Sequence, residues 1–542
     1  MDAVLLLQSL VCGLLCYLGS GESPWLFGIT GSFYTVGRPL VAGLLLGLLF
    51  GDVAAGVLCG VAVQAVFIAN MNSGGATNAD VVYASYGGIG LALATDADPA
   101  VAVTLSVLIG QTLGLLIYNA KMAAYSFFNN RFEDAVERLD YRGLTLWHLV
   151  IPQLTSCALR AVPIAALVCL GQGVLDALLA AVPDVALHII AVIGGLLPAL
   201  GIAILMSVVL QKPPELVFFF GGFVLAAYLD LPMLAVVLVA AVVAYLMYVA
   251  SGCGDLAGLA GPDTPPPSPS ERGADSRLTH RELVRLWLRW AFFGLASMSF
   301  EKLEACGFCF SMEPLAHRYY ADDPEGARAL LRRHAIFYNT EPQIGSVVNG
   351  IAVSLEEEKA LGADVPDDLP VTVKTALMGP LAGIGDTIVQ GVVVPTLLSI
   401  GMGLAAGGSV LGPVFYILSY MTFGVAVSYV CFMAGHRLGA GAMDAVLGEG
   451  VKRVTGALNV LGIMVVGALA ATNVDVTTPL VIPSGDGTTA LQTLLDSIFP
   501  QLLPMLAVLV TWHLIAHRKL SATRAILVLC AAAIVLGGLG IL

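Results

Sequence analysis

Asp386, Thr387 and Gln390 lie close together in a largely apolar stretch at residues 378–404, MGPLAGIGDTIVQGVVVPTLLSIGMGL. A charge inside a membrane costs at least about 2.5–3.5 kcal/mol, so an intramembrane aspartate normally faces a cavity or a partner. Glycines and prolines flank these residues, as in broken helices that border protein or an internal aqueous space. The stretch therefore predicts a re-entrant or discontinuous helix lining a substrate site. The alternative, that Asp386 caps a helix at the membrane surface, stays open.

A second polar cluster lies within residues 51–80, where Gln64, Asn72, Gly75, Asn78 and Asp80 interrupt apolar sequence. Amides and carboxylates bind hydroxyl groups through directed hydrogen bonds, and glycine permits a close approach of the backbone. The cluster fits a ligand rich in hydroxyl groups, and a polar surface loop between two helices is the alternative. Both clusters contain a Gly-Asp pair and a glutamine, which hints at two related halves around one site.

The composition is that of a polytopic membrane protein. Of the 542 residues, 58% are hydrophobic and 12% are charged, and the mean hydropathy is +0.88. Several stretches without Asp, Glu, Lys or Arg reach the roughly 20 residues that a spanning helix requires. We expect an all-α fold with on the order of twelve membrane segments. The formal charge of −13 argues against nucleic-acid binding, which requires a basic surface.

The sequence divides into two helical modules. Residues 253–280 are rich in Pro, Gly and Ser, which predicts a flexible linker. The first module is residues 1–252 and the second is residues 281–542. Within the second, the charged residues 281–375 predict cytoplasmic or interfacial helices, and residues 376–542 predict a membrane part.

The charged region opens with an amphipathic pattern. Leu283, Leu286, Trp287 and Trp290 fall on one helical face, and arginines occupy another. This pattern predicts a helix that lies on the membrane surface.

Basic residues predict the orientation, because short cytoplasmic loops concentrate Lys and Arg. We expect the loop that contains Lys121 and Arg131 to face the cytoplasm, and residues 475–496, which contain no Lys or Arg, to face outward. Successive loops alternate between the two sides of the membrane in the last three predicted spans. This leaves the C-terminus outside and places residues 281–375 on the cytoplasmic side.

Motifs for autonomous chemistry do not occur in the sequence. There is no P-loop, no H-E-x-x-H and no G-x-S-x-G, so ATP use, zinc hydrolysis and serine hydrolysis have no support. The close cysteine pair Cys306 and Cys309 is interpreted as two small buried apolar side chains. We expect no cofactor and no metal site.

Four motifs carry a resemblance to a known family: FEKLEACGFCFSMEPL, RRHAIFYNTEPQIGSVVNGIAVSLEEEKA, MGPLAGIGDTIVQG and GSVLGPVFY. They resemble enzyme IID of the mannose family of phosphotransferase-system (PTS) sugar permeases, over residues 283–542. The first module resembles enzyme IIC, mainly in RPLVAGLLLGLLFGDVAAGV and in residues 64–80. Because IIC and IID are typically separate chains in that family, the sequence looks like a natural fusion of the two.

The resemblance implies a permease of the bacterial cytoplasmic membrane, assembled as a homotrimer. Its substrate would be a hexose or amino sugar of the mannose, fructose, sorbose or N-acetylgalactosamine class. Soluble IIA and IIB proteins would relay a phosphoryl group from phosphoenolpyruvate through phosphohistidines. Since phospho-IIB would phosphorylate the sugar, this chain would not be catalytic alone.

The resemblance also implies a set of sugar contacts: Gln64, Asn72, Gly75, Asn78, Asp80, Asp386, Thr387 and Gln390. Three further residues match family motifs, with docking, gating and structural roles open: Glu301, Asn339 and Glu341. Mannose-type IIC proteins carry Glu in place of Gln64 and Pro in place of Ala79. GDTIVQG is more similar to the amino-sugar type, which places mannose itself in doubt as the substrate.

Two other function classes stay open. An ion-coupled secondary transporter would use Asp80 and Asp386 for protons or Na⁺ and would accumulate free substrate. A receptor for a bacteriocin-like peptide would be a further role of the same fold.

Overall fold

The computed structural model describes residues 3–68, 70, 77, 79–95, 97–181, 184–210, 212–250, 277–439, 449–484, 487–520 and 522–542. The predicted linker lies almost entirely outside these residues. The described part of the chain is helical apart from one small hairpin, formed by β1 (Val481–Ser484) and β2 (Gly487–Ala490). The prediction of an all-α polytopic membrane protein is confirmed.

The helices of the first module range from single turns to long helices and are often interrupted by π-helical or 3₁₀ turns, labelled η. They are α1 (Ala3–Leu18), η1 (Gly28–Thr30), η2 (Ser32–Val36), α2 (Pro39–Phe50), α3 (Val53–Phe67), α4 (Val81–Tyr83), η3 (Ala84–Ile89), α5 (Gly90–Ala94), α6 (Pro99–Ile109), η4 (Gly110–Gly114), α7 (Leu115–Arg138), α8 (Tyr141–Thr145), η5 (Leu146–Val150), α9 (Ile151–Ala181), α10 (Asp184–Val209), η6 (Pro213–Glu215), α11 (Leu216–Ala227) and α12 (Met233–Ala250).

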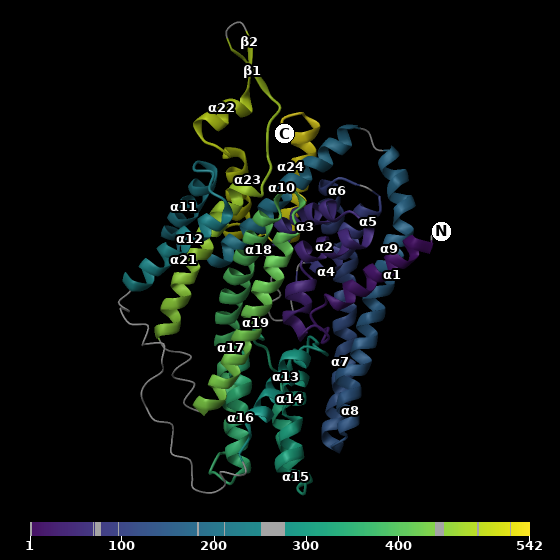
Figure 1. The fold of residues 1–542 in the computed structure, drawn as a ribbon, viewed down its shortest axis with the longest axis vertical. Helices are drawn as coiled ribbons and strands as arrows, with labels where there is room; N and C mark the ends of the chain where they lie inside the picture. The colour runs from purple at the N-terminus through teal and green to yellow at the C-terminus, as the bar shows by residue number, and fades with distance from the viewer. Residues whose placement is uncertain are drawn as a thin grey trace.

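The second module begins with four helices at one end of the molecule and continues into longer apolar ones (Figure 1). Its elements are α13 (His280–Phe293), α14 (Ala305–Tyr319), α15 (Pro324–His334), α16 (Ser346–Ala360), α17 (Leu369–Gly385), η9 (Asp386–Val393), α18 (Val394–Leu404), η10 (Ala406–Gly408), α19 (Leu411–Leu438), α21 (Glu449–Thr472), the β1–β2 hairpin, α22 (Leu491–Ile498), α23 (Leu502–Ala516) and α24 (Ala522–Gly538).

Fewer single helices span a membrane than the composition suggested. Within the described residues, five helices are long and apolar enough, and two pairs bent by 73° and 77°, Gly28–Phe50 and Leu491–Ala516, raise the number to as many as seven. Other apolar helices, or the apolar parts of longer ones, extend over only 10–17 of the described residues, as in Ala3–Leu18 and Gly195–Ser207. Counting apolar stretches in the sequence predicts about twelve membrane segments, because composition does not show where a helix bends or ends.

The apolar stretch around Asp386 is one helix, so the prediction of a re-entrant or discontinuous helix is wrong at this position. α17, η9 and α18 form a continuous 36-residue span, Leu369–Leu404. The polar residues lie in its π-helical part, Asp386–Val393. Pro395, near the start of α18, has no backbone N–H and so removes one hydrogen bond from the span.

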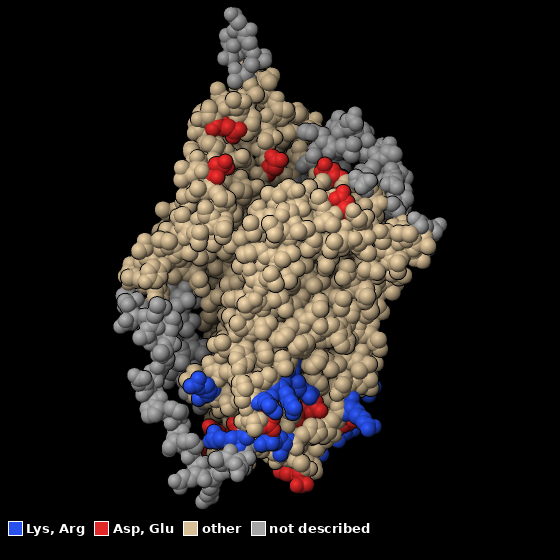
Figure 2. Space-filling model, viewed as in Figure 1, with Lys and Arg blue, Asp and Glu red and all other residues tan. Residues whose placement is uncertain are grey.

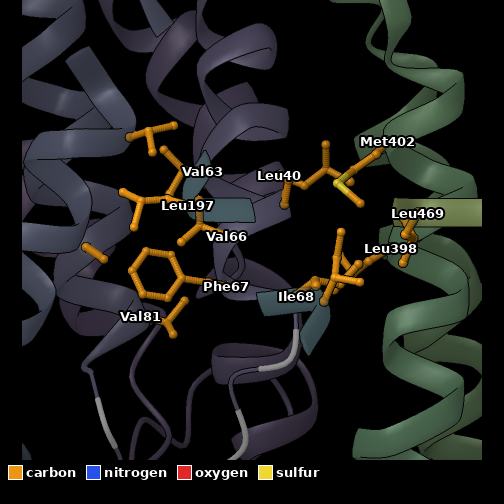
Figure 3. Packing of buried hydrophobic residues seen from close by; sticks show 14 of the residues in the cluster. Leu40, Val63, Val66, Phe67, Ile68, Val81, Leu197, Leu398, Met402 and Leu469 are labelled. Atoms are coloured by element: carbon orange, nitrogen blue, oxygen red, sulfur yellow. The ribbon is translucent and has the colours of Figure 1, made fainter. Parts of the chain in front are cut away.

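The two modules share one hydrophobic core. A single cluster of buried apolar side chains contains residues of both, and in Figure 3 Leu40 and Ile68 of the first module lie opposite Met402 and Leu398 of the second. Helices α10, α11 and α12 of the first module pack against α21, α23 and α24 of the second. Burial of this surface therefore holds the modules together as one body.

The apolar face of the amphipathic helix α13 is buried against other helices of the protein. Leu286, Trp287 and Trp290 are at most 6% exposed and belong to a core with α14, α16 and α19. The indole of Trp287 donates to Ser428 Oγ at 3.0 Å, and that of Trp290 donates to the Pro342 carbonyl at 3.2 Å. The predicted membrane-surface helix is wrong, because an apolar stripe cannot distinguish a lipid partner from a helical one.

Hydrogen bonds attach residues 295–304, which connect α13 to α14, to the first module. Asn129 Nδ2 donates to Ser299 Oγ at 2.8 Å, and Gln153 Nε2 donates to the Ala296 carbonyl at 3.0 Å. His148 Nδ1 lies 2.7 Å from Ser297 Oγ. Helices α7 and α9 thus hold this segment in place beside the centre of the molecule.

Charge is distributed unevenly between the two ends of the molecule. On the face shown in Figure 2, Lys and Arg gather at the end formed by α13–α16 and α8, while the opposite end shows Asp and Glu. The C-terminus and the β1–β2 hairpin lie toward that acidic end (Figure 1).

The contact between α11 and α21 provides a test of how tightly the modules pack. A Cβ atom added at Gly222 would lie 1.8 Å from the Met464 carbonyl oxygen, whereas one at the adjacent Gly221 would meet nothing within 4 Å. We expect Gly222→Ala to destabilise the protein by about 1–3 kcal/mol through overpacking. Gly221→Ala, the matched control, should be neutral or stabilise its helix by up to about 1 kcal/mol.

Thermal unfolding of the two purified variants measures the difference. Equal melting temperatures for Gly221→Ala and Gly222→Ala would show that the modules do not meet closely at this point.

Candidate functional site

A pocket lies between the two modules, lined by residues from both. Its polar lining consists of Glu22, Thr77, Asp80, Tyr118, Lys121 and Arg160 from the first module and Glu304, Asn339, Thr340, Asp386 and Gln390 from the second. Phe33 and Tyr34 add an aromatic wall. A pocket with an apolar frame and a few convergent polar groups is the usual form of a small-molecule site.

The structure brings together part of the predicted site. Asp80, Asp386, Gln390 and Asn339 line this one pocket, although Asp80 is more than 250 positions from the others in the sequence. The predicted contacts Asn72, Gly75 and Asn78 lie outside the described residues. The remaining predicted residues do not line the pocket: Gln64, Thr387, Glu301 and Glu341.

Asp80 is held by backbone and side-chain bonds. It caps α4, where its Oδ1 accepts hydrogen bonds from the amides of Val82 and Tyr83 at 3.1 Å each. Arg160 Nη2 donates to Asp80 Oδ2 at 2.8 Å, and Nη1 donates to Oδ1 at 3.3 Å. The carboxylate therefore has a fixed direction and is satisfied on both oxygens.

Arg160 belongs to a network of four buried charges, Glu22, Asp80, Lys121 and Arg160, which we call the charge quartet. Glu22 Oε1 accepts from Arg160 Nε at 3.2 Å, and Glu22 Oε2 lies 2.9 Å from Lys121 Nζ. Ser156 Oγ donates to Glu22 at 2.6 Å. All four charged side chains are at most 5% exposed, and their two positive and two negative charges balance.

The second module contributes Asp386 and Gln390 from successive turns of its π-helical segment. Gln390 Nε2 donates to Asp386 Oδ1, which orients both side chains. Gln390 is 4% exposed, and its Oε1 has no hydrogen-bond partner among the described residues. A buried amide oxygen without a partner costs free energy, so this atom is suited to accept a hydrogen bond from a ligand.

A turn at residues 339–345 completes the second-module wall. Glu341 packs so closely against the long helix that a Cβ atom at Gly385 would lie 2.3 Å from its Cβ, which requires glycine there. Its Oε2 accepts from the Ile344 amide at 2.7 Å, and burial raises the pKa of Glu341 to about 8. Burial likewise raises the pKa of Glu304, whose Oε2 accepts from the Thr340 amide at 3.3 Å.

Three predicted residues lie elsewhere. Gln64 is fully buried on α3, where its Oε1 accepts weakly from the Leu40 amide at 3.4 Å. Thr387 donates to the Gly383 carbonyl at 2.8 Å, a bond within its own helix. Glu301 is exposed. Their roles stay predictions.

The sequence interpretation missed Glu22, Lys121, Arg160 and Glu304. Lys121 was expected in a cytoplasmic loop, which is wrong: it lies within α7 and is 2% exposed. Arg160 is a lone charge in an apolar run, a pattern that indicates a buried partner and could have identified it. Within the described residues, no three His, Cys, Asp or Glu side chains gather as a metal site would require.

Comparison with known proteins assigns a family to each half of the chain. Residues 277–542 match the model described as the PTS system mannose/fructose/sorbose family IID component, and residues 6–246 match the model described as the PTS system sorbose-specific IIC component. Few residues of the chain lie outside the two matches.

Three relatives illustrate the two halves. The mannose-specific EIID component of Escherichia coli K12 is 34% identical over 43% of this chain and 84% of its own length. The fructose permease IID component of Bacillus subtilis is 31% identical over 44% of this chain and 89% of its own. The fructose permease IIC component of the same organism is 30% identical over 36% of this chain and 71% of its own.

Each relative matches only one module, and together they account for both. The chain belongs to the mannose/fructose/sorbose family of PTS permeases, with a IIC component and a IID component joined in one polypeptide.

Proposed function

We propose that this permease binds a hexose or amino sugar in the pocket between its modules and carries it across the membrane for phosphorylation by a separate phospho-IIB. The observation that carries the proposal is the joint lining of one buried pocket by Asp80 of the IIC half and by Asp386 and Gln390 of the IID half. Neither half alone encloses the ligand, which agrees with a function that requires both components.

The pocket chemistry suits a ligand with many hydroxyl groups. The carboxylates of Asp80 and Asp386 and the amide oxygen of Gln390 accept hydrogen bonds, and the amide of Asn339 both donates and accepts. Phe33 and Tyr34 offer an apolar wall for the carbon face of a sugar ring. Because these groups are oriented by the protein, a sugar that lacks one matching hydroxyl leaves a buried group unpaired and binds less tightly.

The sequence favours an amino sugar over mannose, because Gln64, Ala79 and the GDTIVQG motif differ from the mannose type. The substrate class proposed here therefore includes N-acetylgalactosamine beside mannose, fructose and sorbose.

The proposed setting is the bacterial cytoplasmic membrane, with residues 281–375 in the cytoplasm and the C-terminus outside. The basic end of the molecule supports this orientation, since positive residues concentrate on the cytoplasmic side (Figure 2). IIB would approach from that end, after receiving its phosphoryl group from IIA. The proposed assembly is a homotrimer.

An ion-coupled transporter is the second candidate, and one observation favours it. Glu341 lies beside the pocket with its pKa raised by burial to about 8, so its carboxyl group exchanges a proton near physiological pH. Such a transporter would accumulate the free sugar rather than its phosphate.

Inverted membrane vesicles or proteoliposomes that contain the full chain separate the two candidates. Radiolabelled mannose, fructose, sorbose and N-acetylgalactosamine are supplied with and without phosphoenolpyruvate and the soluble PTS proteins. The permease predicts formation of a sugar phosphate that depends on phosphoenolpyruvate. Accumulation of free sugar that follows a proton or Na⁺ gradient, without those proteins, would instead establish the ion-coupled transporter.

Asp80 provides a sharper test of the pocket. We expect Asp80→Asn to keep the cap on α4 but to remove the negative charge that Arg160 and the sugar share, which lowers uptake at low sugar concentration by about 10- to 100-fold. The loss of the buried ion pair with Arg160 also destabilises the protein, so the melting temperature of the variant is measured beside its uptake. Asp52, an exposed aspartate that caps α3, is the matched control, and Asp52→Asn should transport normally.

Uptake is compared at equal amounts of protein in the membrane, as measured by immunoblotting. Undiminished uptake in the Asp80→Asn variant would remove Asp80 from the sugar site.

A further inference from the structure

The two walls of the pocket differ in charge. The first-module wall carries two cations, Lys121 and Arg160, which are balanced by Glu22 and Asp80. The described residues that line the second-module wall include the carboxyl groups of Glu304 and Asp386 but no Lys, Arg or His. The pocket therefore has an electrically balanced wall and an acidic wall.

This difference acts on a phosphoryl group more strongly than on a sugar. A sugar is neutral and can form hydrogen bonds with either wall. A phosphoryl group carries about two negative charges. Next to the second-module wall it would meet no cation among the described residues. Burial favours the neutral form of Glu304 by raising its pKa, so the repulsion comes from the carboxylate of Asp386, and like charges repel strongly where water is excluded. Phosphoryl transfer within the pocket is thus favoured at the wall that contains Lys121 and Arg160.

Of the two cations, Lys121 is held by fewer acidic partners: it pairs with Glu22 alone, whereas Arg160 pairs with both Glu22 and Asp80. Arg160 already donates from Nε to Glu22 and from both terminal nitrogens to Asp80. An ammonium group has three N–H donors, and the salt bridge of Lys121 to Glu22 at 2.9 Å accounts for one of them. Its Nζ lies 4.9 Å from the centre of the Tyr118 ring, which also lines the pocket.

We propose that Lys121 is a catalytic residue that contacts the phosphoryl group during its transfer to the sugar. The sugar hydroxyl that becomes phosphorylated therefore faces the charge quartet, and the opposite side of the sugar faces Glu304 and Asp386. The inference rests on the proposed function, because it assigns a role within phosphorylation by phospho-IIB.

The step balances without a further reactant. The bond between phosphorus and the phosphohistidine nitrogen of IIB breaks as a bond forms from phosphorus to the sugar oxygen. The proton of the sugar hydroxyl passes to the nitrogen that the phosphoryl group leaves. Lys121 keeps its protons and stabilises the charge on the phosphoryl oxygens, as fixed cations do in other phosphoryl transfers.

Substitution of Lys121 in the full-length permease tests the proposal. The probe is the sugar, among the four supplied above, that the unaltered protein phosphorylates fastest. With saturating sugar and phospho-IIB, we expect Lys121→Gln to lower kcat by about 10- to 100-fold, whereas Lys121→Arg, which keeps the cation, should retain at least about a third of it. Lys302 pairs with Glu133 outside the pocket, so Lys302→Gln is the control for loss of a paired lysine.

A second measurement does not depend on catalysis. The phosphate ester of the same sugar should compete with the radiolabelled sugar for the permease in detergent, and Lys121→Gln should weaken this competition by about tenfold or more. Glu22 keeps its bonds to Arg160 and Ser156 in that variant, but the charge quartet loses one positive charge. The melting temperature of Lys121→Gln is therefore compared with that of the unaltered protein before the competition is measured.

The outcomes separate this inference from the proposed function. Loss of kcat and of competition in Lys121→Gln, with both restored in Lys121→Arg, supports it. Full activity of Lys121→Gln, or equal loss in Lys121→Gln and Lys121→Arg, overturns it while the permease function stands. Absence of phosphorylation by the unaltered protein overturns the proposed function itself.

Discussion

The burial of four charges in one network is the constraint on which the pocket depends. Glu22, Asp80, Lys121 and Arg160 come from four separate parts of the first module and are almost completely excluded from solvent. A buried ion pair that loses one partner costs about 3–5 kcal/mol, because the remaining charge is left uncompensated. The loop after α1 and helices α4, α7 and α9 must therefore meet in one arrangement, and that arrangement forms half of the pocket before any ligand arrives.

The other half depends on backbone geometry rather than on ion pairs. A π-helical segment within the long helix Leu369–Leu404 places Asp386 and Gln390 side by side, and Gly385 lets the turn at Glu341 approach that helix. Such segments occur within α-helices and recur at functional sites. The membrane span can thus stay continuous where it borders the site.

The sequence predicts part of the pocket lining. Asp80, Asp386 and Gln390 could be assigned to a common pocket because a polar side chain in apolar sequence requires a cavity or a partner. The continuous helix around Asp386 could not be predicted. Gly and Pro destabilise a helix, but they do not show whether it ends, kinks or continues through a π-helical segment. Glu22 and Lys121 were missed for another reason: 99 positions separate them, and only the fold shows that they pair.

The shared core has a consequence for how the two components evolve. Because α10, α11 and α12 of the IIC half interlock with α21, α23 and α24 of the IID half, complementary shapes on both sides are inherited together. At Gly222 a backbone carbonyl of the other half lies directly opposite, so a larger side chain there requires a compensating change in the other half. Chimaeras that combine the IIC half of one family member with the IID half of another would meet steric conflicts at this seam, and a single reading frame keeps the matched pair from being separated.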